Sequence, residues 1–502
     1  MKNRSIGIVL SYLNTGMDMV CGLFLSSFLL RMLGDTEYGI YQTIASFANY
    51  LILLEFGTGT VMTRNISMCR GGGAEREEIQ RNVTSIWMLA WILAAVIAAV
   101  AAVFYLSIDS IYAATLDLAQ RAHAKNIFLL VTVYLLCSFL MQTLNGVILA
   151  YEHYRFGAVQ KICRTVLRTG LLVGLVSMNR SSAVIACVDA VLSAVLLIVS
   201  AGYVLKNFHI RLRPGKMNAA VVRTALPLAA ALFLQTIVNQ ANNNVDKFLI
   251  GIMLSPQSVS LYSVAMYIYS IFSSLTTIPI SMYAPSVGKW MQQKTQTTQL
   301  EKHLVAPCRM VAFTGGMIYF GFIAMGRPFV ELVYGDKYAQ AWIIAVIVMT
   351  PMYLNMINGV LINVLDALNK RMVRSVALIA TTAANIALTV IWLKLWGVVG
   401  AALATALCTF LGQVLIMNVY YHKKLKINVL YLFREALRGI LPWMLIGCAA
   451  ALWVGSLTGS LVWTLVVRCV LFCGITLGGY LIRGISEWEK QLLKRLLRRE
   501  AA

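Results

Sequence analysis

The chain has 502 residues, of which 59% are hydrophobic and only 12% are charged. This composition excludes a soluble globular protein of the same length and is typical of a chain that crosses a membrane many times. The formal net charge of +22 would suggest a nucleic-acid-binding protein if it were concentrated in one domain. The basic residues are instead spread as single residues and pairs between apolar stretches, which favours contact with anionic lipid headgroups and predicts no nucleic-acid partner.

Apolar stretches long enough to cross a bilayer as helices follow one another along the whole sequence. The first begins at Ile6, continues past Asp18 to Leu30 and lacks a small-residue cleavage pattern, so we expect a retained helix and not a signal peptide. The sequence predicts fourteen spans, at residues 6–30, 40–63, 83–106, 127–150, 158–178, 183–205, 224–251, 259–285, 309–326, 339–365, 374–393, 397–420, 436–455 and 461–482.

The gaps between these spans alternate in charge. Most of the 42 Lys and Arg residues fall in every second gap and in the two terminal segments. Because Lys and Arg mark the cytoplasmic side of a membrane protein, both termini are predicted to be cytoplasmic. The opposite gaps carry few basic residues, namely Arg31, Arg121, Lys125, Arg180, Lys247, Arg327, Lys337 and Lys394.

Two pairs of short matching motifs indicate an internal repeat. Met32-Leu33 and Ile40-Tyr41 are matched by Met253-Leu254 and Leu261-Tyr262, and Asn145-Gly146 is matched at nearly the same separation by Asn358-Gly359. In both pairs, the two matching motifs lie at spans of the same predicted orientation, as in transporters built from parallel repeats. The expected fold is therefore all-α, with two parallel six-helix lobes around a central cavity. Their expected limits are 1–206 and 207–421, followed by two extra helices and a basic tail at 422–502.

The fifth span carries the clearest candidate site. Lys161, Arg164 and Arg168 fall at positions i, i+3 and i+7, hence on one helix face, and helical rise takes Arg168 about 12 Å into the membrane. This stripe suits a phosphate or pyrophosphate headgroup, because Arg binds phosphate oxygens in a forked geometry. The alternative is that these long side chains snorkel toward the interface. Arg64, at the cytoplasmic end of the second span, is a further candidate for the cationic site.

Acidic residues within spans are costly unless they face protein or water, so each is a candidate site residue. Asp18 lies midway through the first span, and Glu55 lies in the second span ahead of Gly57. Both are predicted to line a cavity, where a proton or a sodium ion could serve as coupling ion. The alternative for Asp18 is a hydrogen bond between helices. Asp189 in the sixth span is a lone carboxylate, and its neighbours in sequence give weaker support for a site than those of Asp18 and Glu55.

The seventh span carries a polar run near its outer end. Asn239, Asn243, Asp246 and Lys247 approximate one helix face, and amides and carboxylates match the donors and acceptors of sugar hydroxyls. Asp246 and Lys247 are adjacent, so we expect only one of them to face the cavity. The alternative is that these polar groups join neighbouring helices.

No catalytic constellation is recognisable. The five histidines lie in or beside loops, no Walker sequence is present, and no cysteine pair has metal-site spacing with histidine. The sequence therefore predicts a protein that is not an enzyme and has no metal or other cofactor.

Several degenerate motifs together resemble a known family. They are Arg31-Met32-Leu33-Gly34 with Tyr38-Gly39-Ile40-Tyr41, Asp246-Lys247-Phe248, Leu261-Tyr262-Ser263, Tyr334-Gly335-Asp336-Lys337-Tyr338, Asn385, and Trp396-Gly397-Val398-Val399-Gly400. In their order and spacing the chain resembles the polysaccharide-transporter, O-antigen flippase-type branch of the multidrug/oligosaccharidyl-lipid/polysaccharide exporter superfamily. The resemblance implies two lobes that open a central cavity alternately to each side. It also implies an undecaprenyl-pyrophosphate-linked oligosaccharide as substrate, a bacterial cytoplasmic membrane, and polysaccharide polymerase machinery as a partner.

Three alternatives remain open at this stage. A cation-coupled multidrug exporter would use acidic cavity residues such as Asp18 and Glu55, although Arg164 and Arg168 argue against a cationic substrate. A flippase for the peptidoglycan precursor is a closer alternative, and the sequence does not exclude it. A membrane-embedded glycan polymerase or ligase would be expected to carry a sizeable extracytoplasmic loop, and none of the predicted gaps is long enough.

Overall fold

The structure is a computed structural model of the chain. It describes residues 2–48, 51, 57–71, 75–113, 115–208, 210, 218, 221, 245–293, 296–368, 370–455 and 460–485. Every regular element formed by these residues is a helix, so the predicted all-α fold is confirmed. The chain separates into two compact units, Met1–Ser260 and Leu261–Ala502, which are described one at a time. The lobe boundary predicted at residues 206 and 207 stays a prediction.

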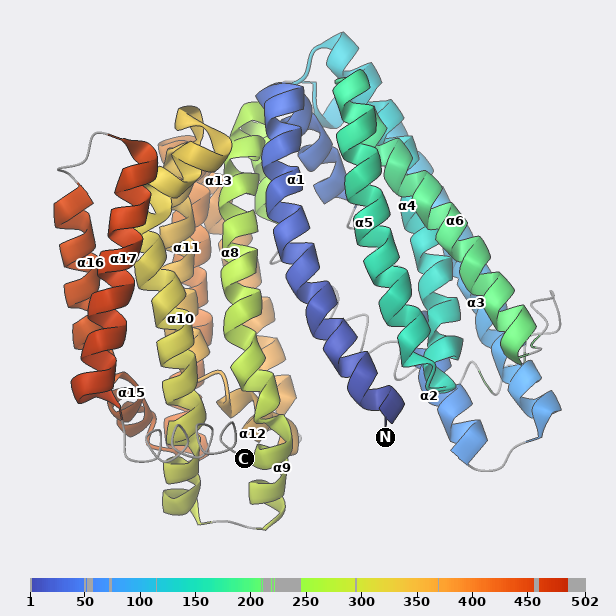
Figure 1. Cartoon of the computed structure of the whole chain (residues 1–502). Coiled ribbons are helices and arrows are strands. Elements are labelled where there is room, and N and C mark those ends of the chain that lie inside the picture. The colour runs from blue at the N-terminus through green and yellow to red at the C-terminus, as the bar shows by residue number, and fades with distance from the viewer. Residues whose placement is uncertain are drawn as a thin grey trace. The chain divides into compact units, whose positions relative to one another are not determined.

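In the described residues up to Phe208, the first unit forms helices α1 to α6 (Figure 1). They are α1 (Lys2–Ala48), α2 (Thr58–Gly71), α3 (Arg76–Ile111), α4 (Leu118–Ala150), α5 (Tyr154–Met178) and α6 (Ala183–Phe208). Helix α4 packs against α1, α2, α3, α5 and α6. Its Phe128 and Phe139 form a buried cluster with Ile44 of α1, Trp87 of α3 and Ala186 of α6. Helix α4 is therefore the centre of this unit.

Close packing in the first unit depends on small residues. A Cβ atom added at Gly146 of α4 would lie 2.3 Å from the backbone oxygen of Gly59 on α2. One turn away, the hydroxyl groups of Thr58 and Thr143 are 2.8 Å apart and share a hydrogen bond. In a bilayer, helices associate through such close packing and hydrogen bonding, because lipid tails are as apolar as the helix surfaces.

Two long helices each contain one residue with non-helical geometry. In α1 this residue is Gly34, with φ of 80°, and in α13 (Arg371–Thr409) it is Gly397, with φ of 58°. Only glycine adopts positive φ without a steric cost, so these residues permit the chain to bend. Gly34 lies between the first two predicted spans, and Gly397 lies at the boundary predicted between the eleventh and twelfth.

The second unit contains most of α8 (Pro256–Met282) and the helices that follow it. These are α9 (Ala284–Gln292), α10 (Thr297–Tyr334), α11 (Gln340–Ile357), α12 (Leu361–Ala367), α13, α14 (Met417–Lys424), α15 (Val429–Leu437), α16 (Leu441–Gly455) and α17 (Leu461–Gly479). A short 3-10 helix lies at Asp336–Tyr338, and π-helical segments lie at Phe410–Ile416 and Tyr480–Gly484. Helix α10 packs against α11, α15, α16 and α17, which makes it the centre of this unit.

A buried arginine fastens the C-terminal helices to α10. Arg309 of α10 is only 6% exposed. Its Nη1 atom donates hydrogen bonds of 2.9 Å to the backbone oxygens of Glu435 and Arg438, and its Nη2 atom donates one of 2.9 Å to the backbone oxygen of Gly484. The guanidinium group thus joins the C-terminal end of α15 and the segment after α17 to the central helix of the unit.

The described residues contain nine helices that are long and apolar enough to cross a membrane, or ten if the bent pair α15 and α16 forms one span. The chain is therefore a multi-pass membrane protein, but the predicted count of fourteen spans is not confirmed. Helices α1 and α13 each run through two predicted spans, and most of the seventh predicted span lies outside the described residues. Helix α5 is not among the nine, and it carries Lys161, Arg164 and Arg168 along its length.

Candidate functional site

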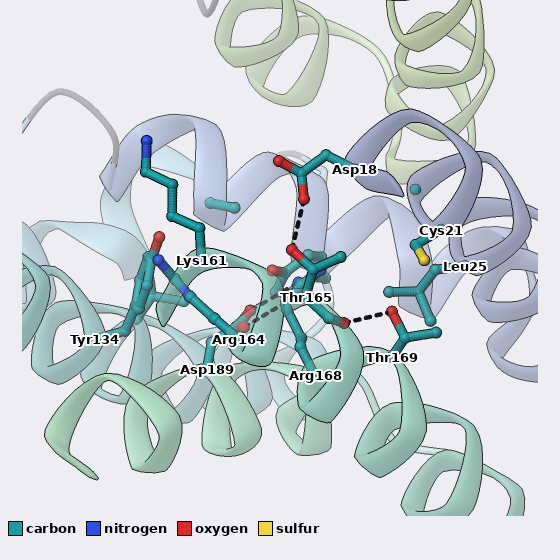
Figure 2. A pocket seen from close by; sticks show the side chains of 14 residues that line it. Asp18, Cys21, Leu25, Tyr134, Lys161, Arg164, Thr165, Arg168, Thr169 and Asp189 are labelled. Atoms are coloured by element: carbon teal, nitrogen blue, oxygen red, sulfur yellow. Dashed lines mark hydrogen bonds and ion pairs between the residues drawn. The ribbon is translucent and has the colours of Figure 1, made fainter. Parts of the chain in front are cut away.

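A cavity of about 570 Å³ lies within the first unit, between α1, α4, α5 and α6. Its charged lining residues are Asp18 of α1, Lys161, Arg164 and Arg168 of α5, and Asp189 of α6 (Figure 2). The uncharged lining includes Cys21, Leu25, Tyr41, Tyr134, Thr165 and Thr169. Charged side chains from three separate helices therefore converge on one space inside a helical unit that is otherwise apolar.

The deepest basic residue of the stripe on α5 forms an ion pair. Arg168 Nε donates to Asp189 Oδ1 at 2.5 Å, and Arg168 Nη2 donates to Asp189 Oδ2 at 2.9 Å. Two parallel hydrogen bonds of this kind fix the orientation of a guanidinium group more strongly than one. The Asp189 side chain is only 9% exposed, whereas the Arg168 side chain is 32% exposed. Both residues line the cavity, and the arginine is the more accessible of the two.

Sequence reasoning treated Asp189 as a lone carboxylate and so missed this ion pair. Arg168 lies ten residues before the end of α5 at Met178, and Asp189 lies six residues after the start of α6 at Ala183, so both lie well inside their helices. The long arginine side chain can span the difference in position along two successive helices. Opposite charges inside consecutive spans joined by a short turn are the signal that could have identified the pair.

The second carboxylate of the cavity contacts α5 as well. Thr165 Oγ1 donates a hydrogen bond of 2.5 Å to Asp18 Oδ1, which joins α1 to α5 (Figure 2). The Thr169 hydroxyl donates in turn to the backbone oxygen of Thr165 at 2.8 Å. Asp18 itself is exposed. A carboxylate and a hydroxyl group at the cavity wall can both accept hydrogen bonds from sugar hydroxyl groups.

The two outer cations of the stripe have different surroundings. The Arg164 guanidinium carbon lies 5.5 Å from the centre of the Tyr134 ring, which is a cation–π contact. Lys161 is exposed. Among the residues that the structure describes, neither Arg164 nor Lys161 forms an ion pair with a carboxylate. Both can therefore bind an anion in the cavity without first losing a partner.

The other predicted site residues are not brought to this cavity. Arg64 is an exposed residue of α2 and does not line it. Asp246 is buried and Lys247 is half-buried, and neither lines it. Glu55, Asn239 and Asn243 lie outside the described residues.

A second polar cluster joins three helices of the same unit. His123 Nε2 lies 3.1 Å from Glu37 Oε2 and 3.1 Å from Ser182 Oγ. The Ser182 hydroxyl donates to the same Glu37 oxygen at 2.6 Å, and the Ser182 backbone nitrogen donates to it at 3.2 Å. The cluster connects α1 beyond its bend at Gly34 to α4 and to the residue before α6. The described part of the chain shows no group of His, Cys, Asp and Glu that could hold a metal ion.

A charged cavity between the helices of a multi-pass membrane protein is an architecture that transporters use. The model of the family described as "Polysaccharide biosynthesis protein" matches residues 2–289. The chain therefore belongs to this polysaccharide biosynthesis family, and the family resemblance inferred from the sequence motifs is confirmed.

A curated relative supports the same assignment over part of the chain. A protein of Haloferax volcanii named "Probable low-salt glycan biosynthesis flippase Agl15" is 25% identical over 174 residues, which is 34% of this chain. The matched segment is 36% of the length of that relative.

Solved structures share the fold. The lipid II flippase MurJ in its inward closed conformation matches with a TM-score of 0.72 and 15% identity, covering 95% of this chain and 100% of that chain. An inward-facing multidrug resistance transporter of the MATE family matches with a TM-score of 0.60 and 16% identity, covering 83% of this chain and 95% of that chain. At such low identity these structures establish the fold alone, which is that of the multidrug/oligosaccharidyl-lipid/polysaccharide exporter superfamily.

Proposed function

We propose that the chain is a flippase that moves an oligosaccharide linked to undecaprenyl pyrophosphate across the bacterial cytoplasmic membrane. The observation that carries this proposal is the line of three basic side chains, Lys161, Arg164 and Arg168, along the cavity face of α5. A cationic surface inside an apolar helical unit is costly unless it serves an anion, and a pyrophosphate group presents several anionic oxygens to it. Membership of a polysaccharide biosynthesis family supports the glycan part of the cargo.

In this mechanism the cavity takes the headgroup while the lipid tail stays in the bilayer. Arg168, held by Asp189, and Arg164 bind the phosphate oxygens, and Lys161 adds a mobile charge nearer to the cytoplasmic end of the stripe. Asp18 and Thr165 bind hydroxyl groups of the first sugars. The cavity of about 570 Å³ falls within the usual range for small-molecule sites, so it accommodates the pyrophosphate and a few sugar units.

The proposal also covers the arrangement of the lobes and the location of the termini. We propose two six-helix lobes at 1–206 and 207–421 that expose the cavity to each side in turn, with both termini in the cytoplasm. Residues 422–502 supply two extra helices and a basic tail. No catalytic step is assigned to the chain. Asp18 is the candidate for coupling transport to a proton or sodium gradient, and the polymerase that uses the flipped repeat unit is the expected partner.

A reconstitution assay tests this function. Purified protein in liposomes receives undecaprenyl pyrophosphate carrying a fluorescent oligosaccharide, and movement between leaflets is followed by quenching from outside, with and without an ion gradient. Movement faster than in protein-free liposomes is the expected result. Fluorescent lipid II in parallel liposomes distinguishes a peptidoglycan-precursor flippase from a polysaccharide flippase.

A multidrug exporter is the second candidate, because an exposed carboxylate, Asp18, lines the cavity and could bind a cation. Efflux of a lipophilic cation such as ethidium, together with no movement of either lipid-linked glycan, would replace the flippase assignment with this one.

A further inference from the structure

The charge that remains in the cavity after the cargo has left poses a physical problem for the proposed flippase. A carrier that releases its anion must return empty, with the basic side chains still inside the membrane. An uncompensated guanidinium group in a membrane interior costs several kcal/mol, by the scale of insertion measurements. An efficient carrier therefore needs a counter-ion of its own for the return step.

The cavity contains such a counter-ion for one cation of the three. Along α5 the order from the cytoplasmic end is Lys161, Arg164 and Arg168, so Arg168 is the deepest. Among the described residues, it is also the one of these three basic residues that forms an ion pair with a carboxylate, that of Asp189. The exposed Lys161 can reach the interface and remain hydrated, and Arg164 lies against the Tyr134 ring. The negative charge of Asp189 thus lies beside Arg168, the basic side chain of the three that solvent is least able to stabilise.

The geometry of the pair leaves Arg168 able to bind cargo. A guanidinium group has five N–H donors. Asp189 uses one edge of the group, formed by Nε and Nη2. The opposite edge, formed by Nη1 and the second N–H of Nη2, has the same forked arrangement and suits two phosphate oxygens. Arg168 can therefore bind an anion without releasing Asp189.

We infer that Asp189 is the built-in counter-ion of the empty carrier, which neutralises Arg168 while the cavity returns without cargo. This inference rests on the proposed flippase function and deepens it. Asp189 is a positioning and compensating residue and does not touch the cargo. Its loss should impair the return of the empty carrier more than the movement of the loaded one, because the cargo itself supplies the missing negative charge.

The test compares two modes of transport in liposomes that contain Asp189→Asn protein. In the net mode, fluorescent undecaprenyl-pyrophosphate oligosaccharide starts in one leaflet alone, so each cycle needs an empty return. In the exchange mode, the opposite leaflet holds the same concentration of unlabelled cargo, so the carrier can return loaded. We expect the net rate to fall at least about tenfold, since an unpaired buried charge is strongly unfavourable, while the exchange rate stays close to that of the wild-type protein.

Two variants provide the controls. Asp109→Asn breaks the Lys125–Asp109 ion pair, which has a contact of 2.5 Å and lies outside the cavity. Both rates of this variant should match the wild type. Asp189→Glu retains the negative charge and should restore part of the net rate.

Thermal unfolding and size-exclusion profiles accompany the assay, to show whether the Asn variant is folded. If it does not fold, Arg168→Gln is compared with the double variant Arg168→Gln, Asp189→Asn. The single variant leaves a buried carboxylate uncompensated, so its net rate should be lower than that of the double variant.

The possible outcomes separate the two proposals. Equal loss of net and exchange rates in Asp189→Asn would overturn the counter-ion role, as would equal net rates of the single and double variants. If the wild-type protein moves the cargo in neither mode, the proposed function fails and the inference fails with it.

Discussion

Two arginines within long helices of this chain are held in different ways. Arg309 of the second unit is 6% exposed and donates hydrogen bonds to three backbone oxygens. Arg168 of the first unit has a side chain that is 32% exposed, and it binds one carboxylate along one edge. An arginine side chain thus joins chain segments through hydrogen bonds in one unit and forms part of a cavity wall in the other.

The difference lies in which donors remain available. Both Nη atoms of Arg309 are engaged with backbone groups of segments that follow α15 and α17, so moving the side chain would disturb both segments. Among the described residues, Asp189 binds one forked edge of Arg168, which lines the cavity, and this partner is a side chain on a neighbouring helix. Burial of an arginine in a membrane protein therefore does not by itself indicate function, and the geometry of its partners does.

The largest effect is expected from removing the hydrogen bonds that Arg309 donates to the C-terminal segments. Arg309→Met should lower the free energy of unfolding by about 3 kcal/mol, because hydrogen bonds to a charged donor contribute about 1.5–3 kcal/mol each and are not additive. Thermal unfolding in detergent measures this loss. Arg434→Met, at an exposed position on α15, is the matched control and should shift stability by less than about 0.5 kcal/mol. Equal stabilities of the two variants would contradict the fastening role.

The next largest effect concerns transport. Arg168→Gln should reduce flipping of the lipid-linked oligosaccharide at least about tenfold, because a forked bond to phosphate contributes more than a neutral hydrogen bond. Arg168→Lys should be intermediate, since an ammonium group cannot bind in forked geometry. The reconstitution assay measures both. Arg81→Gln, at an exposed position on α3, serves as control, and a flipping rate for Arg168→Gln equal to that of this control would remove Arg168 from the site.

A smaller effect, dependent on salt, is expected at the outer end of the stripe. Lys161→Gln should weaken binding of inorganic pyrophosphate about threefold in dilute buffer, and the difference from wild type should shrink at high salt, because exposed charges are screened. Titration calorimetry on detergent-purified protein at two salt concentrations checks this. A defect that does not change with salt would indicate that Lys161 binds pyrophosphate directly in a desolvated position.

The smallest effect is expected at the threonine that contacts Asp18. Thr165→Val removes the hydrogen bond from Thr165 to Asp18 and keeps the shape of the side chain. This hydrogen bond is exposed, so it contributes at the low end of the usual range, about 0.5 kcal/mol, and flipping should slow about twofold. The rate should be compared with that of Thr63→Val, which removes hydroxyl hydrogen bonds to the backbone oxygens of Gly59 and Gly146 outside the cavity. Equal rates would show that the contact with Asp18 has no part in transport.

The sequence predicted those features that depend on periodicity and composition. The all-helical membrane fold followed from apolar stretches, and the shared face of Lys161, Arg164 and Arg168 followed from helical spacing. The partners of those residues depend on which helices pack together, so the contacts of Arg168 with Asp189 and of Asp18 with Thr165 could not be read from spacing alone. Arg309 was placed at the start of a span, and nothing in the sequence indicated that distant backbone oxygens would bind it.

The charge of the cavity also determines how it responds to voltage. Three basic and two acidic side chains line it, which leaves a formal charge of +1 when it is empty. A doubly charged pyrophosphate cargo would change this to −1. Each elementary charge moved across the membrane changes the energy by about 2.3 kcal/mol per 100 mV. With a potential that is negative inside, the loaded cavity is driven outward and the empty one inward, so the resting potential favours both halves of an export cycle.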